Sequence, residues 1–178
     1  HLMCYANIVS DQMSRHSVYL WTLPMFHCNG WCFPWTVTAA AGTHVCLRWV
    51  RAGAIFEAMA EHGVTHLCGA PVVMSAMLNA TANEVRALPR RVQFITAAAP
   101  PPEAVLSRME QAGFDVTHVY GLTETYGPAT VNEWKGEWDA LDPSGRAARK
   151  ARQGVRYAAL EGLTVMNPET MEVVPSDG

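Results

Sequence analysis

Two hydroxyls flank one carboxylate in the stretch Thr123-Glu124-Thr125. The stretch follows an apolar segment, Asp115 to Val119, that is typical of a buried strand, and a turn is expected at Tyr120-Gly121, where glycine accepts conformations that a Cβ disfavours. A hydroxyl can donate a hydrogen bond to a phosphate oxygen, and a carboxylate is a hard oxygen ligand for Mg²⁺. These residues therefore predict a phosphate and magnesium site at a strand end, although a polar turn that caps the next element has the same composition.

His27 is a second side chain that could take part in catalysis. It follows Pro24-Met25-Phe26, after a strand that the apolar run 18–23 predicts. An imidazole in this position could stabilise negative charge or position a nucleophile. A single histidine in an apolar segment is more often a hydrogen-bonded core residue, and on the residues alone this alternative stays open. The same structural interpretation is given to His16, His44, His62 and His66.

Strands and helical patterns alternate along most of the chain, which predicts a layered α/β fold with a largely parallel sheet and flanking helices. Strands are expected over 18–23, 43–47, 64–68, 92–96, 115–119 and 128–132. Helices are expected over 2–14, 31–41, 54–62, 72–78, 102–112 and 142–151. Ligands of open α/β sheets gather at the carboxyl ends of the strands. Three segments that follow strands are therefore predicted to line one crevice: Phe26-His27, Thr96 to Pro100 and Tyr120 to Glu124.

Proline and glycine set several of the expected helix boundaries. Pro34 is tolerated only in the first turn of its helix, which Asn29 would cap and Gly42 would end. Gly63 is expected to terminate the helix before it, and Pro71 to occupy the first position of the next one.

The region after residue 132 gives weaker signals. Its Arg- and Ala-rich run up to Ala151 predicts a solvated helix whose charges lie on the surface rather than in a nucleic-acid patch. Residues 163–166 and 171–174 bracket Asn167-Pro168, which is a hairpin signal.

Composition excludes several classes of protein. The length of 178 residues fits one ordinary domain, and a net charge of -3 offers no basic surface for nucleic acid. No apolar run reaches the roughly 18 residues of a membrane span. The five cysteines lie in apolar segments, which favours reduced thiols and a cytoplasmic location over a disulfide framework. The Cys28 and Cys32 pair has no second pair at zinc-finger spacing, so no zinc site is expected.

Three segments resemble, in the same order, motifs of the adenylate-forming (AMP-binding) superfamily. Tyr120 to Thr125 resembles its Tyr-Gly-x-Thr-Glu core, Leu23 to Trp31 its Pro-x-Phe-His segment, and Phe94 to Pro101 its Ser-Gly-Ala-Ala-Pro adenine loop. The resemblance covers essentially the whole chain and is strongest to the acyl-CoA synthetase (fatty-acid–CoA ligase) branch. It implies that residues 1–178 are part of one large N-terminal domain. The phosphate loop would then lie upstream, and a small lysine-bearing domain downstream.

The resemblance implies an ATP-dependent acid–thiol ligase, in which a carboxylic acid, expected to be a fatty acid, and ATP form an acyl-adenylate that CoA captures. Glu124 would hold Mg²⁺, Thr123 would donate to the α-phosphate, and His27 would approach the acyl carboxylate. The whole protein could be a homodimer. Without the phosphate loop and the lysine, the 178 residues alone are not expected to make acyl-CoA.

The resemblance also implies contacts to the nucleotide and to the acid. Nucleotide contacts are expected from Ala97, Ala98, Ala99, Pro100, His118, Val119, Tyr120, Gly121, Leu122 and Thr123. Acid contacts are expected from His27, Trp31, Gly121 and Tyr126. Ala97 departs from the family, where glycine is usual, and a methyl there is costly only if φ is positive. His118 stands where many relatives have Gln.

Trp31 has two interpretations. In long-chain relatives the matching Trp gates the acyl tunnel, whereas buried aromatics are also ordinary core, which is the interpretation given to Trp21, Trp35 and Trp49. Two alternatives to the ligase remain. One is a non-catalytic scaffold that binds nucleotide or acyl groups. The other is a luciferase-like or peptide-synthetase adenylating enzyme, which the Trp-rich segment disfavours.

Overall fold

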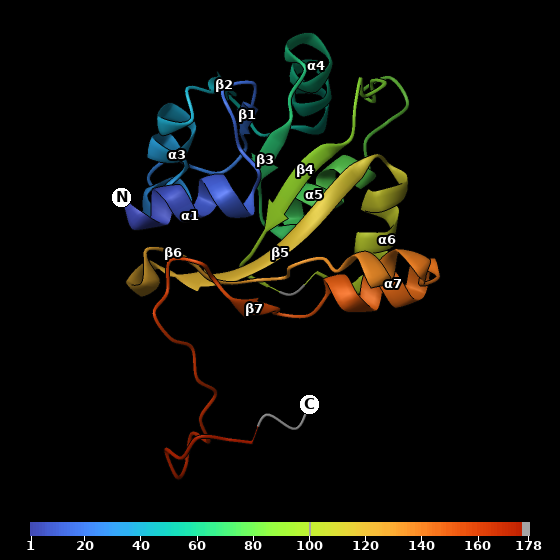
Figure 1. Ribbon diagram of the computed structural model, residues 1–178. Coiled ribbons are helices and arrows are strands. Elements are labelled where there is room, and N and C mark those ends of the chain that lie inside the picture. The colour runs from blue at the N-terminus through green and yellow to red at the C-terminus, as the bar shows by residue number, and fades with distance from the viewer. Residues whose placement is uncertain (100, 176–178) are drawn as a thin grey trace.

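The computed structural model describes residues 1–99 and 101–175, and within them seven strands form a single sheet (Figure 1). The strands are β1 (Val18–Trp21), β2 (Thr43–Cys46), β3 (His66–Cys68), β4 (Val92–Thr96), β5 (Phe114–Leu122), β6 (Gly127–Val131) and β7 (Val155–Arg156). Their order is β2-β1-β3-β4-β5-β6-β7. Strands β1 to β5 pair in parallel, whereas β6 and β7 join antiparallel. The predicted α/β fold with a largely parallel sheet is confirmed.

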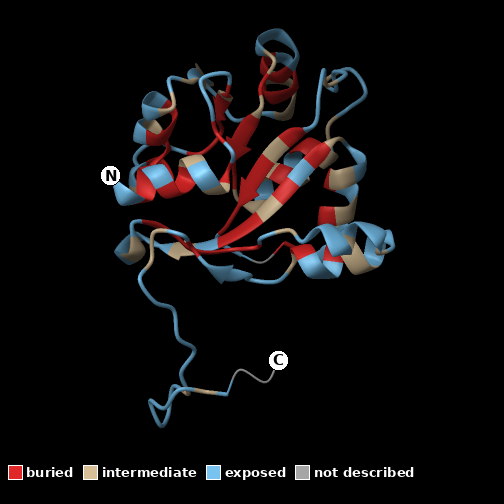
Figure 2. Ribbon diagram, in the orientation of Figure 1, coloured by how far each residue is buried: buried red, intermediate tan, exposed pale blue. Residues whose placement is uncertain are grey.

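Helices cover both faces of the sheet. They are α1 (Leu2–Ser10), α2 (Cys28–Trp31), α3 (Phe33–Ala39), α4 (Ala52–His62), α5 (Pro71–Leu78), α6 (Glu103–Gln111) and α7 (Pro143–Lys150), with 3₁₀ turns η1 (Thr123–Thr125) and η2 (Gly136–Ala140). Helices α1 and α3 contribute to one apolar cluster, and α4 to α7 to the other. The central strands are buried from both sides (Figure 2). Among the described residues, no helix is long and apolar enough to cross a membrane.

Alternation along a strand divides its side chains between these two clusters. In β1, Tyr19 and Trp21 pack with α1 and α3, while Leu20 between them packs with the helices of the other face. In β5, Val119 belongs to the first cluster and Val116 to the second. Because successive side chains point to opposite faces, a strand buried on both sides reads as a continuous apolar run, as the sequence of β1 does.

Several predicted boundaries are confirmed. Gly63 has φ +61 and terminates α4, Pro71 is the first residue of α5, and Pro34 lies in the first turn of α3. The expected end of α3 at Gly42 is wrong. The helix stops at Ala39, and Ala41 takes the left-handed conformation with φ +55.

The expected turn at Tyr120-Gly121 is wrong. Strand β5 continues to Leu122, pairs with β6 despite an irregularity between Tyr120 and Gly121, and turns only at η1. Gly121 is not among the residues with positive φ. A Cβ at this position would collide with the carbonyl of Gly127 on the facing strand. Glycine is therefore required here by the close approach of two backbones, not by a turn.

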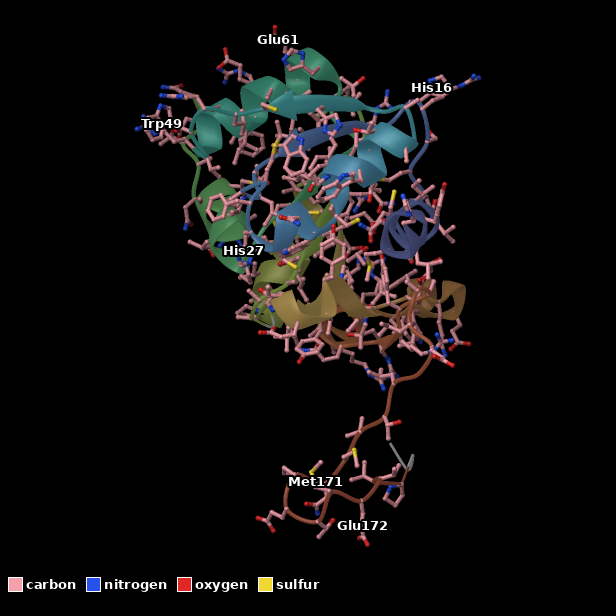
Figure 3. All side chains as sticks on the ribbon, turned by 90° about the vertical axis from the view of Figure 1, so that its left-hand side faces the viewer. His16, His27, Trp49, Glu61, Met171 and Glu172 are labelled. Atoms are coloured by element: carbon pink, nitrogen blue, oxygen red, sulfur yellow. The ribbon has the colours of Figure 1, made fainter. Side chains whose placement is uncertain are left out.

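The core interpretation holds for Trp21, which is 5% exposed, but it is wrong for Trp35 and Trp49, which are 50% and 62% exposed. Figure 3 shows Trp49 at the surface. Arg48 and Arg51 lie over its ring at 5.7 and 5.8 Å from the ring centre. Cation–π contacts with guanidinium groups therefore replace burial for this indole.

The C-terminal predictions are confirmed in part. Asp142 caps α7 by accepting a hydrogen bond from Gly145 at 2.8 Å. The charges of α7 are not all solvated, since Lys150 is buried and its Nζ lies 2.9 Å from Asp115 Oδ1. The hairpin around Asn167 is reduced to its turn and a single bridge between Met166 and Val173. This segment extends away from the sheet (Figures 1 and 3).

Candidate active site

A left-handed run of backbone shapes the segment that follows β1. All residues from Cys28 to Cys32 have φ between +43 and +67, and only Gly30 among them is a glycine. At Gly30 a Cβ would meet the Trp21 ring at 2.9 Å, so this glycine packs flat against the core. Non-glycine residues in this conformation cost of order 1–3 kcal/mol each and persist only where the surroundings enforce them. The run returns the chain toward the sheet and buries the Trp31 indole to 8% exposure.

A buried chain of hydrogen bonds holds the Trp31 backbone in place. Tyr157 donates its hydroxyl to Asn7 Oδ1 at 2.8 Å, and Asn7 Nδ2 donates to the Trp31 carbonyl at 3.0 Å. Tyr157 is 1% exposed and Asn7 is fully buried. Because breaking such a chain would leave buried polar groups unpaired, Trp31 is fixed by partners far along the sequence.

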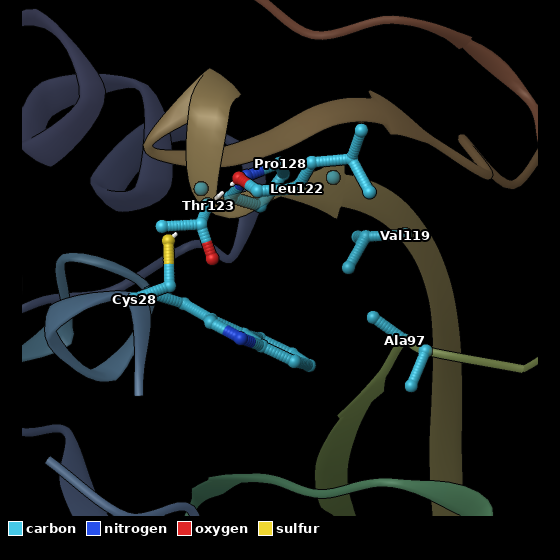
Figure 4. A pocket seen from close by; sticks show the side chains of 10 residues that line it. Cys28, Ala97, Val119, Leu122, Thr123 and Pro128 are labelled. Atoms are coloured by element: carbon cyan, nitrogen blue, oxygen red, sulfur yellow. Dashed lines mark hydrogen bonds between the residues drawn. The ribbon is translucent and has the colours of Figure 1, made fainter. Parts of the chain in front are cut away.

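A small, mostly apolar cavity of about 50 Å³ opens beside Trp31. It is lined by Cys28, Trp31, Ala97, Ala98, Val119, Gly121, Leu122, Thr123, Gly127 and Pro128. Figure 4 shows Cys28 and Thr123 on one side of the cavity and Ala97 and Val119 on another. The Cys28 thiol lies 3.7 Å from the Leu122 carbonyl and ties the segment after β1 to the end of β5.

The three motif segments therefore meet in space. Of the residues singled out from the sequence, the cavity lining contains Trp31, Ala97, Ala98, Val119, Gly121, Leu122 and Thr123. They come from α2, from the segment after β4 and from β5 with its turn. The carboxyl ends of parallel strands meet at one edge of a sheet, which is the physical reason for the convergence.

Thr123 belongs to the cavity lining, and Glu124 follows it on η1, outside the lining. Both residues are exposed, and the structure, as far as it describes the chain, gives the Glu124 carboxylate no hydrogen bond or ion pair. His27 is also exposed, immediately before α2. No group of three or more His, Cys, Asp or Glu residues that could enclose a metal occurs among the described residues. A single free carboxylate is nevertheless a suitable ligand for Mg²⁺, which usually binds one or two carboxylates together with phosphate oxygens and water.

His118 and Tyr120 occupy the face of β5 opposite Val119. His118 is 2% exposed and its Nδ1 lies 3.2 Å from the Arg152 carbonyl. Burial lowers the pKa of His118 below its ordinary 6.5, so its ring is neutral at pH 7. Tyr120 leaves 42% of its surface exposed, so part of its flat ring is free to stack. The predicted nucleotide contacts are thus divided between the two faces of one strand.

The backbone of the segment after β4 shows whether a methyl group at Ala97 is strained. Ala97 does not have positive φ, so its methyl is tolerated where the family has glycine. The left-handed position is the next residue, Ala98, with φ +83. Ala99 is exposed, and Pro100 lies outside the described residues.

Tyr126 borders a different cavity. It is 41% exposed and lines a space of about 620 Å³ between α1 and α3, with Tyr5, Cys32 and Trp35 among its other walls. The two cavities lie on either side of the junctions Trp31–Cys32 and Tyr126–Gly127. Tyr126 is therefore not part of the small cavity lined by Trp31.

Two contacts in this region were missed by the sequence analysis. Cys28 was considered only as a zinc ligand, although its place between His27 and Trp31 could have suggested a cavity wall. Thr125 was considered as a phosphate-binding hydroxyl or a helix cap, whereas its hydroxyl joins the ends of β5 and β6. The Thr125 contact has no local sequence signal, because it depends on the pairing of β5 with β6.

Comparisons with known proteins agree with this arrangement. The AMP-binding enzyme family matches residues 1–178. Acetate–CoA ligase CCL3 of Humulus lupulus is 51% identical over 179 residues, which are 100% of this chain and 32% of that protein. The peroxisomal acetate/butyrate–CoA ligase AAE7 of Arabidopsis thaliana is 50% identical with the same coverage. The chain thus spans about a third of the length of these relatives.

Solved structures show the same fold. The N-terminal domain of FACL13 from Mycobacterium tuberculosis aligns with a TM-score of 0.73 at 20% identity, over 88% of this chain and 38% of that chain. O-succinylbenzoate coenzyme A synthetase of Bacillus subtilis, in complex with ATP and a magnesium ion, aligns with a TM-score of 0.73 at 17% identity, over 97% and 33%. At these identities the likeness concerns the fold alone. On the match over its whole length, the chain belongs to the AMP-binding enzyme family.

Proposed function

We propose that the protein carrying this chain is an ATP-dependent acyl-CoA ligase. The observation that supports it most is the meeting of the three motif segments around one cavity, with Thr123 in its lining and Glu124, unpaired among the described residues, next to Thr123 on η1. The acetate–CoA and acetate/butyrate–CoA ligases at 51% and 50% identity favour the same reaction class.

In the proposed reaction a carboxylate oxygen forms a bond to the α-phosphorus of ATP, and pyrophosphate leaves. The thiol sulfur of CoA then forms a bond to the acyl carbon, and AMP leaves. Negative charge gathers on phosphate oxygens, so donors and cations fixed around them dominate catalysis. A magnesium ion bound to Glu124 would neutralise part of that charge. Thr123 donates its hydroxyl to a phosphate oxygen, and His27 positions the acid carboxylate.

The cavity beside Trp31 is proposed to hold the hydrocarbon end of the acid. A volume of about 50 Å³ accommodates only a few water-sized groups, at about 10–15 Å³ for each. Its walls are apolar side chains and backbone, which suits an alkyl group. We therefore propose a short-chain acid, of the size of acetate to butyrate, in place of the longer fatty acid expected from the sequence.

The nucleotide is proposed to lie against the other face of β5. There the exposed Tyr120 ring offers a stacking surface, and the neutral His118 ring is next to it on the strand. Ala98 and Ala99 are small and exposed, so their backbone groups are open to a base. This arrangement places the acid and the nucleotide on opposite sides of one strand, with Thr123 between them.

Location and assembly are proposed from the cysteines and from the family resemblance. We propose a cytoplasmic location from the reduced cysteines, and no disulfide links the five thiols. The relative AAE7 is peroxisomal, so that compartment is the alternative to test. A homodimer remains a proposal from the family resemblance.

The decisive measurement is acid-dependent exchange of pyrophosphate into ATP by the full-length protein, with acetate, butyrate, octanoate and palmitate compared. The proposal expects exchange with acetate and butyrate and little with palmitate. A protein that binds ATP but shows no exchange with any acid would instead be a non-catalytic scaffold. Exchange with amino acids or aromatic acids alone would indicate another kind of adenylating enzyme.

A further inference from the structure

The hydroxyl of Thr125 contacts the backbone at both ends of the turn that carries Thr123 and Glu124. Its Oγ1 accepts a hydrogen bond from the Leu122 amide at 2.9 Å. The same oxygen lies 3.0 Å from the Leu122 carbonyl and 2.8 Å from the Gly127 carbonyl, to which it can donate. Leu122 ends β5 and Gly127 begins β6, so one side chain joins the last pair of this antiparallel hairpin.

The three side chains of η1 differ in their surroundings. Thr123 and Glu124 are exposed, whereas Thr125 is half-buried; its hydroxyl accepts one backbone hydrogen bond and can donate one, to the Leu122 or the Gly127 carbonyl. A further hydrogen bond, from the Tyr126 amide to the Thr123 carbonyl at 3.1 Å, closes the turn from within. Thr123 and Glu124 thus lie on a turn whose geometry depends on the hydrogen bonds of Thr125.

The turn needs this hydroxyl because neighbouring backbone positions are under constraint. Tyr126 has φ +54, and Gly127 has φ +120. Gly121 lies against the Gly127 carbonyl with no room for a Cβ. A side-chain oxygen that accepts from one strand end and donates to the other fixes this arrangement at little entropic cost, since a threonine has a single stiff χ1.

We propose that Thr125 is a positioning residue for the site, and that its hydroxyl fixes Glu124 and Thr123 in the orientation that binds Mg²⁺ and phosphate. This inference rests on the proposed function for the identity of the ligand. Thr125 itself does not touch the ligand, and the proposal concerns its effect on the two residues that precede it.

Two variants separate the hydroxyl from the shape of the side chain. Thr125→Val keeps the branched shape and removes the hydroxyl, and Thr125→Ser keeps the hydroxyl. Thr130→Val is the matched control, because the Thr130 hydroxyl on β6 is buried and has no hydrogen-bond partner among the described residues. All three proteins are made at full length beside the wild type.

The first readout is hydrogen exchange of the Leu122 amide, which requires no knowledge of the activity. The proposal expects the exchange rate to rise about tenfold or more in Thr125→Val and to stay near wild type in Thr125→Ser and Thr130→Val. An unchanged rate in Thr125→Val would overturn the hydrogen-bonded hairpin on which the proposal stands.

The second readout is calorimetric binding of ATP with and without Mg²⁺. In the wild type, Mg²⁺ is expected to increase the affinity for ATP. In Thr125→Val this increase should be about tenfold smaller, the equivalent of one hydrogen bond, while the affinity for ATP without Mg²⁺ is unchanged. A merely structural residue would weaken both measurements together, and that result would overturn the positioning role. If the wild type gains no affinity from Mg²⁺, the ligand assignment and this role both fail, while the exchange data still report on the hairpin.

Discussion

The candidate site has two halves that are built in opposite ways. We define its rim as three exposed residues, His27, Thr123 and Glu124, of which only Thr123 lines the small cavity. At its floor, Trp31 is 8% exposed and is carried by a left-handed run from Cys28 to Cys32. The polar side chains of the rim would find interaction partners in a bound ligand. The side chain of Trp31, by contrast, is already packed against the rest of the fold. Changes at the rim should therefore alter activity with little loss of stability, and changes at the floor should alter both.

The largest effect is expected at the floor, from Trp31→Ala. Removing a buried indole leaves a cavity and costs about 3–5 kcal/mol of unfolding free energy. The same change enlarges the small cavity, of which the Trp31 indole is one wall, so longer acids should gain relative to acetate. Melting curves and kcat/KM for acetate through palmitate, measured in the same preparations, check both expectations.

The outcome for Trp31 also decides between its two interpretations. A mobile gate would lose little stability on truncation, whereas a fixed wall would lose much. The hydrogen bonds from Tyr157 through Asn7 to the Trp31 carbonyl favour a fixed wall. Trp35→Ala is the matched control, because its indole is 50% exposed and its loss should cost far less stability. An unchanged ranking of acids would contradict the assignment of the cavity.

At the rim, Glu124→Gln should lower adenylation on the order of 10²-fold while the fold survives. The substitution keeps the shape of the side chain and removes the charge that would hold Mg²⁺. Pyrophosphate exchange at limiting Mg²⁺ measures the loss, and a melting curve should shift by less than a few degrees. Equal exchange in variant and wild type would exclude Glu124 as the ligand.

Asp11, which follows α1 and is buried, allows the stability of the fold to be tested by pH. Burial, followed by the charge of Glu133, raises the pKa of Asp11 from 3.8 to about 8. The folded protein thus holds a proton that the unfolded chain releases above pH 3.8, so this carboxyl destabilises the fold increasingly from about pH 4 to pH 8. Asp11→Asn should therefore stabilise the protein, with a gain that grows over this range and is level above it.

Urea unfolding of wild type and Asp11→Asn at pH 5, 7 and 8.5 measures this gain. Glu133→Gln should give a smaller gain, because it removes the second of the two causes and leaves the burial unchanged. If the two proteins respond to pH in parallel, the Asp11 carboxyl is not protonated in the folded state.

The sequence predicted the order of elements well because β1, β3 and β4 are largely buried on both faces, and such strands read as apolar runs. It also predicted the meeting of the three motif segments, because the carboxyl ends of parallel strands lie at the same edge of a sheet. It failed on the length of β5, because that strand continues only where the antiparallel strand β6 pairs with it. The residues of β5 alone do not show which strand will pair with it.

Two other failures have different physical causes. The left-handed run at Cys28 to Cys32 contains a single glycine, so most of its positive φ angles have no sequence signal. Trp35 and Trp49 were expected in the core because large aromatics are buried on average, but Trp35 lines the larger cavity, and Arg48 and Arg51 lie over the exposed Trp49 ring. The contact of Asn7 with Tyr157, 150 residues apart, shows that the floor is fixed by the whole fold and not by its own motif.

The smallest effect is expected at Ala98. This residue is exposed like those of the rim, yet its backbone has positive φ like the run from Cys28 to Cys32. Its φ of +83 is a conformation that glycine adopts freely and alanine does not. Ala98→Gly should therefore stabilise the protein by about 0.5–1 kcal/mol, the relief of strain being offset in part by the greater freedom of glycine in the unfolded chain.

Ala97→Gly is the matched control: its φ is not positive, so the same substitution should destabilise by a similar amount. Thermal unfolding of the two variants resolves the opposite signs, since about 1 kcal/mol shifts the melting temperature by about 2–4 °C in a domain of about 150–250 residues. Shifts of the same sign would mean that Ala98 is not strained. Opposite signs would locate the strain at the residue where the cavity and the proposed nucleotide site meet.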